Sequence, residues 1–146
     1  MKIFLATDHA GFELKEKVKK FLTDSDHEVE DCGAYVLDSN DDYPDFVHKA
    51  AVKVGEDTEN SRGNIFGGSG QGEAMVANRV KGVRAAVYYG GSEEIVKLSR
   101  EHNDANILSL GARFITEEQA MHAIKIWLET PFSEEERHKR RIDKIA

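Results

Sequence analysis

The chain has 146 residues, 40% of them hydrophobic and 32% charged, which is typical of one globular domain spanning residues 1–146. Its formal net charge of −7 disfavours nucleic acid or an anionic membrane as a partner, and no apolar run approaches the ~18 residues of a membrane span. The single cysteine, Cys32, excludes a disulfide within the chain, favours a reducing, cytoplasmic location and is expected to be a plain buried thiol.

The first half of the chain alternates apolar runs with amphipathic segments. Residues 3–6 form a short apolar run that predicts a buried strand. From Phe12 to Leu22, apolar residues recur at helical spacing between lysines and glutamates, which predicts a helix. A second strand is expected around Val29, and a polar loop then leads to Pro44, where a second amphipathic helix begins.

The second half repeats this alternation. Strands are predicted at residues 62–66, 83–88 and 106–110, with helices between them. The first of these strands runs into a glycine-rich loop, and a helix is expected to start there. Ser92 is expected to cap the helix that follows the second of these strands.

The end of the chain carries clear helix signals. Thr116 and Gln119 have the spacing of a capping box, Pro131 ends the helix that this box opens, and a highly charged terminal helix is expected over about 133–145. Five predicted strands that alternate with helices indicate an α/β fold with a parallel sheet covered on both faces. Ligands of such sheets bind beyond the carboxyl ends of the strands.

The glycine-rich loop is Gly67-Gly68-Ser69-Gly70-Gln71-Gly72. Its glycines allow close backbone approach, so its N–H groups form a natural site for a phosphate or for an oxyanion that develops during a reaction. It is not a P-loop, because no Gly-Lys-Ser/Thr follows. A nicotinamide fingerprint would need an acid at the end of the next strand, where Tyr88-Tyr89-Gly90-Gly91 stand instead. A tight turn without a ligand is the alternative.

Glu73 follows this loop directly, near the start of a predicted helix. The helix dipole stabilises a carboxylate near a helix N-terminus, and this alone could explain a glutamate at this position. The functional explanation is a base beside an oxyanion site. Interconversion of an aldose and a ketose needs one base that moves a proton between C2 and C1, and donors that stabilise the enediolate oxygen.

Two other segments combine acids, histidines and amides. Asp8 and His9 follow the first strand, where Asp8 either caps a helix or helps to open a furanose ring while His9 contacts phosphate. His102 and Asn103 lie in a polar link between a helix and a strand, which is either a solvated loop or part of a site. In a site, His102 would carry the proton of ring opening, because histidine titrates near neutral pH, and Asn103 would bind sugar hydroxyls.

Three arginines are candidates for phosphate binding. Arg113 follows the fifth predicted strand, and Arg137 and Arg141, four residues apart, share one face of the terminal helix. The glutamates at 134–136 support the opposing view that this helix is only charged and solvated.

No metal site is predicted, because no pair of histidines has metal-ligand spacing and Asp38, Asp41 and Asp42 form only a loose acidic cluster. The remaining histidines are expected to be surface or packed residues: His27, His48, His122 and His138.

The order and spacing of motifs over nearly the whole chain resemble the type B ribose-5-phosphate isomerases, which are grouped with the galactose-6-phosphate isomerase subunits. The motifs are Ala6-Thr7-Asp8-His9-Ala10-Gly11, Asp42-Tyr43-Pro44, Gly67-Gly68-Ser69-Gly70-Gln71-Gly72-Glu73, Ala77-Asn78-Arg79, Gly82-Val83-Arg84-Ala85, Ser99-Arg100-Glu101-His102-Asn103-Asp104-Ala105-Asn106, Gly111-Ala112-Arg113 and Arg137-His138-Lys139-Arg140-Arg141.

This resemblance implies a Rossmann-like three-layer α/β/α sandwich, no cofactor, and a homodimer or tetramer with active sites at the subunit interface. It implies that Asp8 and His102 open the ring, that Asn103 binds the sugar and that Tyr43 lines the pocket. It further implies that the phosphate is bound, partly from the neighbouring subunit, by His9, Arg113, Arg137 and Arg141. It implies that the enediolate is stabilised by Ser69 and the N–H groups of Gly68, Gly70 and Gly72.

One departure separates two branches of that family. Some members have a cysteine base where this chain has Gly67, and the chain resembles the branch that uses a glutamate after the loop, which supports Glu73 as the base. We therefore predict interconversion of ribose 5-phosphate and ribulose 5-phosphate in the pentose phosphate pathway. The alternatives are an isomerase of a hexose 6-phosphate such as allose or galactose 6-phosphate, and a non-catalytic phosphosugar-binding module.

Overall fold

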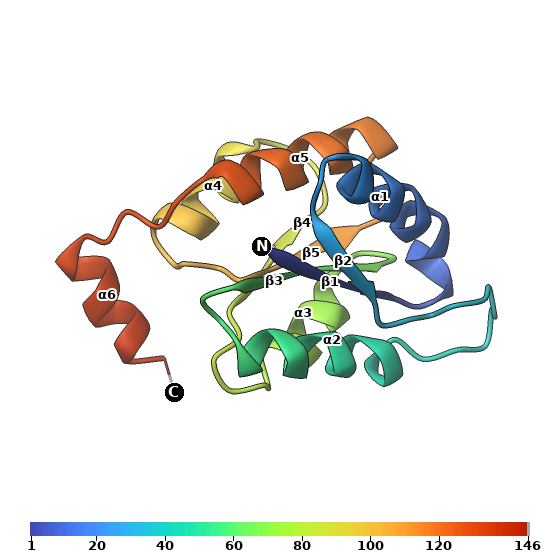
Figure 1. Ribbon diagram of the computed structural model, residues 1–146, viewed down its shortest axis with the longest axis horizontal. Coiled ribbons are helices and arrows are strands. Elements are labelled where there is room, and N and C mark those ends of the chain that lie inside the picture. The colour runs from blue at the N-terminus through green and yellow to red at the C-terminus, as the bar shows by residue number, and fades with distance from the viewer. Residues whose placement is uncertain (146) are drawn as a thin grey trace.

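The computed structural model describes residues 1–145, in which strands and helices alternate along the chain (Figure 1). The elements are β1 (Lys2–Thr7), η1 (His9–Gly11), α1 (Phe12–Asp24), β2 (Glu28–Asp31), α2 (Pro44–Glu56), β3 (Ser61–Gly67), α3 (Gln71–Ala77), β4 (Ala85–Tyr88), α4 (Glu94–Glu101), β5 (Ile107–Gly111), α5 (Glu117–Glu129) and α6 (Glu136–Asp143).

The strands form one five-stranded sheet in the order β2-β1-β3-β5-β4, and every neighbouring pair is parallel. This confirms the predicted α/β sandwich. The strand order reverses between β1 and β3, which pair along the full length of β1 from Lys2 with Ser61 to Thr7 with Phe66. The carboxyl ends of these two strands therefore meet at the switch point where such folds bind ligands.

Helices cover both faces of the sheet, as Figure 1 shows with α1, α4 and α5 on one side and α2 and α3 on the other. On the first side, Leu5, Phe66 and the fully buried Trp127 belong to one apolar cluster. On the second side, Ile65 and Val47 belong to another. Successive residues of a strand point to opposite faces, so Ile65 and Phe66 serve different clusters.

The C-terminal helix is shorter than predicted. The expected helix covered about 133–145, but α6 spans Glu136–Asp143. Glu134 has a positive φ of 60° and Glu135 is extended, with φ −61° and ψ 136°, so the chain turns before the helix begins. Figure 1 shows α6 at the far left, beyond the end of the sandwich. Within residues 1–145, no helix is both long and apolar enough to span a membrane.

Candidate active site

The glycine loop, residues 67–72, lies at the carboxyl end of β3 and is tied to the end of β5. Three hydrogen bonds make this connection: the N–H of Ala112 to the carbonyl of Gly67 (2.8 Å), the N–H of Arg113 to the carbonyl of Gly68 (3.1 Å), and the hydroxyl of Ser109 to the carbonyl of Gly70 (2.6 Å). All three use carbonyl groups of the loop. The loop is therefore held to β5 by its acceptors, and within it the N–H of Gln71 donates to the hydroxyl of Ser69 at 3.3 Å.

Other N–H groups of the loop are not used in this way. In the part of the chain that the structure describes, those of Gly68, Ser69, Gly70 and Gly72 donate to no protein acceptor. Gly70 has a φ of +81°, a left-handed conformation that favours glycine, and α3 begins at the next residue. Successive free N–H groups in such a turn suit an anion, and the binding of an anion here stays a prediction.

The carboxylate of Glu73 lies directly against Gly67. A Cβ at Gly67 would overlap the Glu73 carboxylate, so the backbone of the loop and the acid are in contact. The Glu73 side chain is buried, with 4% exposure, and this burial raises the pKa of its carboxyl, with a smaller contribution from the charge of Asp8. The acid occupies the volume that a side chain at position 67 would need, so a cysteine there and Glu73 in this position exclude each other.

Tyr43 packs against the other side of the loop. It precedes α2, and a Cβ at Gly72 would lie 2.5 Å from its hydroxyl oxygen. Only glycine at position 72 leaves room for this contact. Tyr43 therefore lies beside the glycine loop, and its role in lining a substrate pocket stays a prediction.

Asp8 and His9 follow β1 at the same edge of the sheet. Asp8 is buried, with 7% exposure, and its Oδ1 accepts a hydrogen bond from the N–H of Ala10 at 3.0 Å, so it caps the short helix η1. The capping role that the sequence allowed is therefore present, and it leaves the second carboxylate oxygen of Asp8 available. His9 is partly exposed and contacts Asp41 from the loop before α2.

Arg113 completes the group of predicted residues at this edge. A Cβ at Gly68 would lie 3.1 Å from Nη1 of Arg113, so the guanidinium group lies over the glycine loop. Its positive charge also acts on the His9 ring. The carboxyl ends of β1, β3 and β5 thus bring together Asp8, the buried Glu73, the glycine loop, His9 and Arg113.

His102 and Asn103 lie at the opposite edge of the sheet. His102 is the C-cap of α4, and Asn103 stands in the link that leads to the start of β5. The carbonyl of Asn103 accepts a hydrogen bond at 2.9 Å from Nε of Arg84, the residue before β4. Because all strands are parallel, residues that precede β4 and β5 lie at the amino ends, away from Glu73.

Helix α6 packs beside His102 at the amino ends of the strands, which we call the second edge. The carboxyl ends of the strands, where Glu73 lies, are the first edge. The rings of His102 and His138 are stacked, with centroids 4.3 Å apart and planes inclined by 18°. His138 is buried, which lowers its pKa, and the charge of His102 lowers it further. The sequence predicts only a surface or packed histidine at position 138, and no spacing signal connects it to His102.

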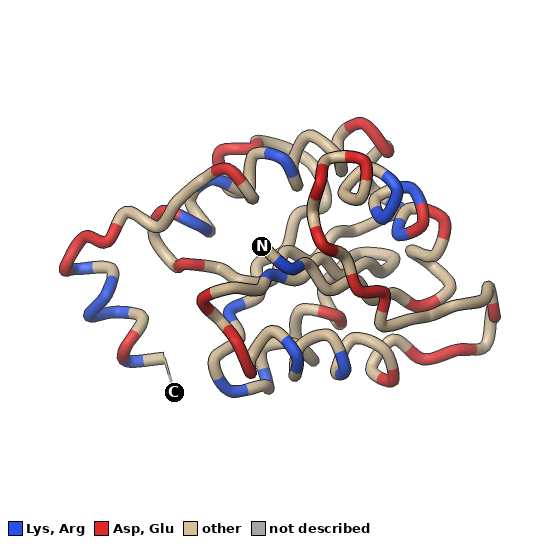
Figure 2. The backbone as a smooth tube through the Cα atoms, viewed as in Figure 1, with Lys and Arg blue, Asp and Glu red and all other residues tan. Residues whose placement is uncertain are grey.

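The two arginines of α6 also lie at the second edge. Arg137 and Arg141 are exposed, and Nε of Arg137 donates a 3.0 Å hydrogen bond to the carboxylate of Glu135. Figure 2 shows the basic residues of α6 on the left and the acidic segment before α2 on the right, at opposite ends of the molecule. One chain therefore does not bring the predicted phosphate clamp to its own glycine loop.

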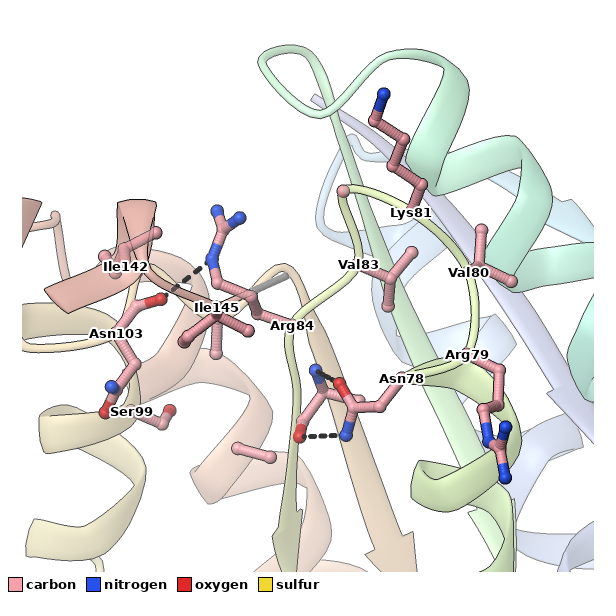
Figure 3. A pocket seen from close by; sticks show the side chains of 14 residues that line it. Asn78, Arg79, Val80, Lys81, Val83, Arg84, Ser99, Asn103, Ile142 and Ile145 are labelled. Atoms are coloured by element: carbon pink, nitrogen blue, oxygen red, sulfur yellow. Dashed lines mark hydrogen bonds between the residues drawn. The ribbon is translucent and has the colours of Figure 1, made fainter.

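A cavity of about 780 Å³ lies at this second edge (Figure 3). Its lining includes Arg84, Asn103 and, from the end of the chain, Ile142 and Ile145, but neither Glu73 nor any residue of the glycine loop. Figure 3 shows the Arg84 side chain beside Asn103, whose carbonyl accepts its hydrogen bond. The cavity thus combines apolar walls with cationic and amide groups.

One cluster has the donor atoms of a metal site. Atoms of Asp8, His9 and Asp41 lie within 4.8 Å of one another. Nδ1 of His9 is already 2.8 Å from Oδ1 of Asp41, so the pair satisfies itself as a hydrogen bond. The expectation that the chemistry here needs no metal stays a prediction.

Comparison with known proteins gives one consistent result. A family model described as ribose/galactose isomerase matches residues 3–145. Ribose-5-phosphate isomerase B of Mycolicibacterium paratuberculosis is 42% identical over 146 residues, which cover 100% of this chain and 90% of the relative. A probable ribose-5-phosphate isomerase B of Mycoplasma genitalium is 41% identical over 143 residues, covering 98% of this chain and 92% of the relative.

Solved structures agree with the sequence matches. Ribose-5-phosphate isomerase B from Mycoplasma genitalium, with bound ribulose-5-phosphate, superposes with a TM-score of 0.94 at 40% identity, covering 99% of this chain and 93% of that chain. A ribose 5-phosphate isomerase from Thermotoga maritima gives a TM-score of 0.90 at 44% identity, covering 99% and 96% of the two chains.

Proposed function

Because the chain belongs to the ribose/galactose isomerase family, we propose that it interconverts D-ribose 5-phosphate and D-ribulose 5-phosphate without a cofactor, in the cytoplasm. The observation that carries the proposal is the buried carboxylate of Glu73, placed against Gly67 at the side of a loop with free N–H groups. A base and an oxyanion site in contact are what an enediolate intermediate requires. The ribulose-5-phosphate bound to the Mycoplasma genitalium relative supports this substrate pair.

The reaction begins with opening of the furanose ring. Asp8 and His102 carry this step in our proposal: one accepts the proton of the anomeric hydroxyl and the other donates a proton to the ring oxygen. The burial of Asp8 supports its role, because a desolvated carboxylate interacts strongly with a nearby hydroxyl. Asn103 binds a hydroxyl of the open chain.

Glu73 then transfers a proton between C2 and C1. It removes the C2 proton of the aldose, and negative charge develops on the C1 oxygen. The hydroxyl proton of O2 passes to O1, and Glu73 returns its proton to C1 as the carbonyl forms at C2. The raised pKa of Glu73 supports this assignment, because it brings the acid closer to neutrality, where a base can both accept and return a proton. The N–H groups of Gly68, Gly70 and Gly72 and the hydroxyl of Ser69 stabilise the enediolate.

Binding of the phosphate group fixes the position of the substrate in the site. His9, Arg113, Arg137 and Arg141 bind it in our proposal, and Tyr43 closes the side of the pocket above Gly72. Charge-assisted hydrogen bonds to a phosphate are strong and directional, and arginine can make two of them at once. The position of Arg113 over Gly68 supports a phosphate near the glycine loop.

Two copies of the chain are needed to assemble this set. Glu73 lies at the carboxyl ends of the strands, whereas His102 and α6 lie at the amino ends of the same chain. In a two-fold dimer, the second edge of one subunit can face the first edge of its partner, so each site is shared. The exposed Met75, Tyr89 and Phe114 near the first edge support a contact there, because they leave apolar surface to cover.

The direct test is turnover by chelator-treated protein on ribose 5-phosphate, with the Glu73→Gln variant in parallel. We expect metal-independent turnover that falls at least ~100-fold in this variant, because a positioned acid–base group contributes about 10²–10⁴. Glu94→Gln is the matched control, since Glu94 also lies in the first turn of a helix but is exposed.

The same assay separates the alternatives. Turnover only on allose or galactose 6-phosphate would keep the mechanism and change the substrate. A folded protein that binds phosphosugars without turning any over would favour a binding module. A loss below ~10-fold in Glu73→Gln would remove Glu73 as the base.

A further inference from the structure

Asp41 contacts His9 twice across 32 residues of sequence. Its Oδ1 accepts a hydrogen bond from the main-chain N–H of His9 at 2.9 Å and lies 2.8 Å from Nδ1 of the same residue. One carboxylate oxygen therefore fixes both the backbone and the ring of His9. With Nδ1 engaged in this way, Nε2 is the nitrogen that can act on a ligand.

The carboxylate of Asp41 is buried although the segment that carries it is exposed. Its side chain is 9% exposed, whereas Asp38, Ser39, Asn40 and Asp42 are all exposed residues. The second oxygen, Oδ2, has no hydrogen-bond partner among residues 1–145. A buried carboxylate oxygen without a partner is unfavourable for folding, so loop stability alone does not explain why this acid points inward.

Three charged groups act on the His9 ring. The hydrogen bond from Asp41 is the largest influence and raises the pKa of His9, and the negative charge of Asp8 acts in the same direction. Desolvation and the positive charge of Arg113 oppose them, without reversing the net upward shift. The ring is therefore kept protonated to a higher pH, with Nε2–H available as a charged donor.

We propose that Asp41 is a positioning residue that holds His9 as an oriented imidazolium for the phosphate dianion of the substrate. Pairing with His9 also neutralises Asp41, whose charge would otherwise repel the phosphate. This inference rests on the proposed function, because it assigns His9 to the phosphate. The hydrogen bonds of the Asp41 carboxylate go to His9, and among residues 1–145 none joins it to Glu73, so Asp41 is placed to serve substrate binding and not the proton transfer between C2 and C1.

The first test is independent of turnover. We would follow the His9 imidazole by NMR during a pH titration of the wild type, Asp41→Asn and Asp42→Asn, with His9→Gln to assign the signal. Asp42 is the matched control, since it is the exposed neighbour of Asp41. We expect the His9 midpoint to fall in Asp41→Asn and to stay unchanged in Asp42→Asn. An unchanged midpoint in Asp41→Asn would overturn the proposal, whatever the substrate proves to be.

The second test measures binding through kinetics. At about pH 8, where neutral His9 would be common without Asp41, we expect the KM for ribose 5-phosphate to rise about tenfold in Asp41→Asn, the effect of one lost hydrogen bond to a charged group. The kcat value should stay within about twofold, because Asp41 does not assist proton transfer. The inhibition constant of inorganic phosphate should rise with KM, and both should return toward the wild type at about pH 6, where His9 is protonated in either protein.

A double-mutant cycle separates positioning from general damage to the loop. In a His9→Gln background, Asp41→Asn should add no further increase in KM, because the partner of Asp41 is already gone. An equal increase in both backgrounds, or a fall in kcat with KM unchanged, would contradict the proposal. Asp41→Ser removes the same carboxylate and replaces Asp41→Asn if the amide disturbs the fold of the loop.

Discussion

At the residue scale, Glu73 stands in surroundings that disfavour its charged form. The start of α3 attracts a negative charge, but burial has the larger effect and raises the pKa of this carboxyl. The role that we propose for Glu73, a catalytic base, nevertheless requires that its carboxyl be ionised for part of the time near neutral pH. The site therefore holds a group whose ionisation reduces the stability of the fold, a common cost of active sites.

This predicts a stability change that accompanies loss of activity in Glu73→Gln. Because the folded pKa of Glu73 is raised, the native state binds more protons than the unfolded state, and stability falls as pH rises from the unfolded pKa through the folded one. A glutamine side chain does not ionise, so the variant does not lose stability in this way. Thermal unfolding should show a higher Tm for the variant at about pH 8, with an advantage that disappears at about pH 4, near the ordinary glutamate value. A lower Tm than the wild type at about pH 8 would contradict the assigned environment.

Residue type and order in the sequence were sufficient to predict Glu73, the glycine loop and Arg113 at one edge of the sheet. They were insufficient to predict that Asp41 points inward to His9 and that His138 stacks on His102. An acid in a polar loop is usually solvated, and nothing local shows that Asp41 turns inward to a histidine 32 residues away. The stacking of His138 on His102 depends on where α6 packs, which the helical pattern of α6 alone does not determine.

At the element scale, α1 is joined to the loop that follows β2 by a buried lysine. Lys15 is fully buried, and its Nζ donates hydrogen bonds to both oxygens of Asp31, each at 2.8 Å, and to the carbonyl of Ala34 at 2.6 Å. Burial alone would raise the pKa of Asp31, but the bond from Lys15, supported by other donors, lowers it. Helical spacing places Lys15 among solvated lysines, so only the partner on β2 reveals its role.

We predict that Lys15→Met destabilises the protein by about 3 kcal/mol, because it leaves the buried Asp31 with too little positive charge. The loop after β2 leads to Asp41 and Tyr43, so KM should rise as well. Lys20→Met is the control, since the Lys20–Asp24 pair is exposed and should contribute less than about 0.5 kcal/mol. Urea unfolding measures both variants, and equal losses in the two would refute a special role for Lys15.

Element boundaries were predictable where caps are local. Thr116 and Gln119 form the predicted capping box, and α5 ends at Glu129, before Pro131. Ser92 lies one residue before the N-cap, Glu93, yet its hydroxyl accepts the N–H of Glu94 at 3.2 Å. These signals act within four residues, which is why they can be read from the sequence.

At the scale of the whole molecule, the topology divides the predicted site between two ends of one chain. A helix that follows a parallel strand returns the chain to the amino end of the sheet, so residues after a strand and residues after a helix lie at opposite edges. Asp8, Glu73 and Arg113 are of the first kind, and His102 is of the second. The sequence order alone does not show which of these residues share a pocket.

The most direct test of this account is complementation between two inactive variants. We would co-express Glu73→Gln and His102→Gln chains with different tags and purify the mixed dimer. If each site combines Glu73 of one subunit with His102 of the other, one of the two sites is intact, and the mixed dimer should recover about half of the wild-type turnover. A mixed dimer of Glu73→Gln and Asp8→Asn should stay inactive, because these residues lie at the same edge. No recovery in the first dimer, or equal recovery in both, would contradict a site shared between subunits.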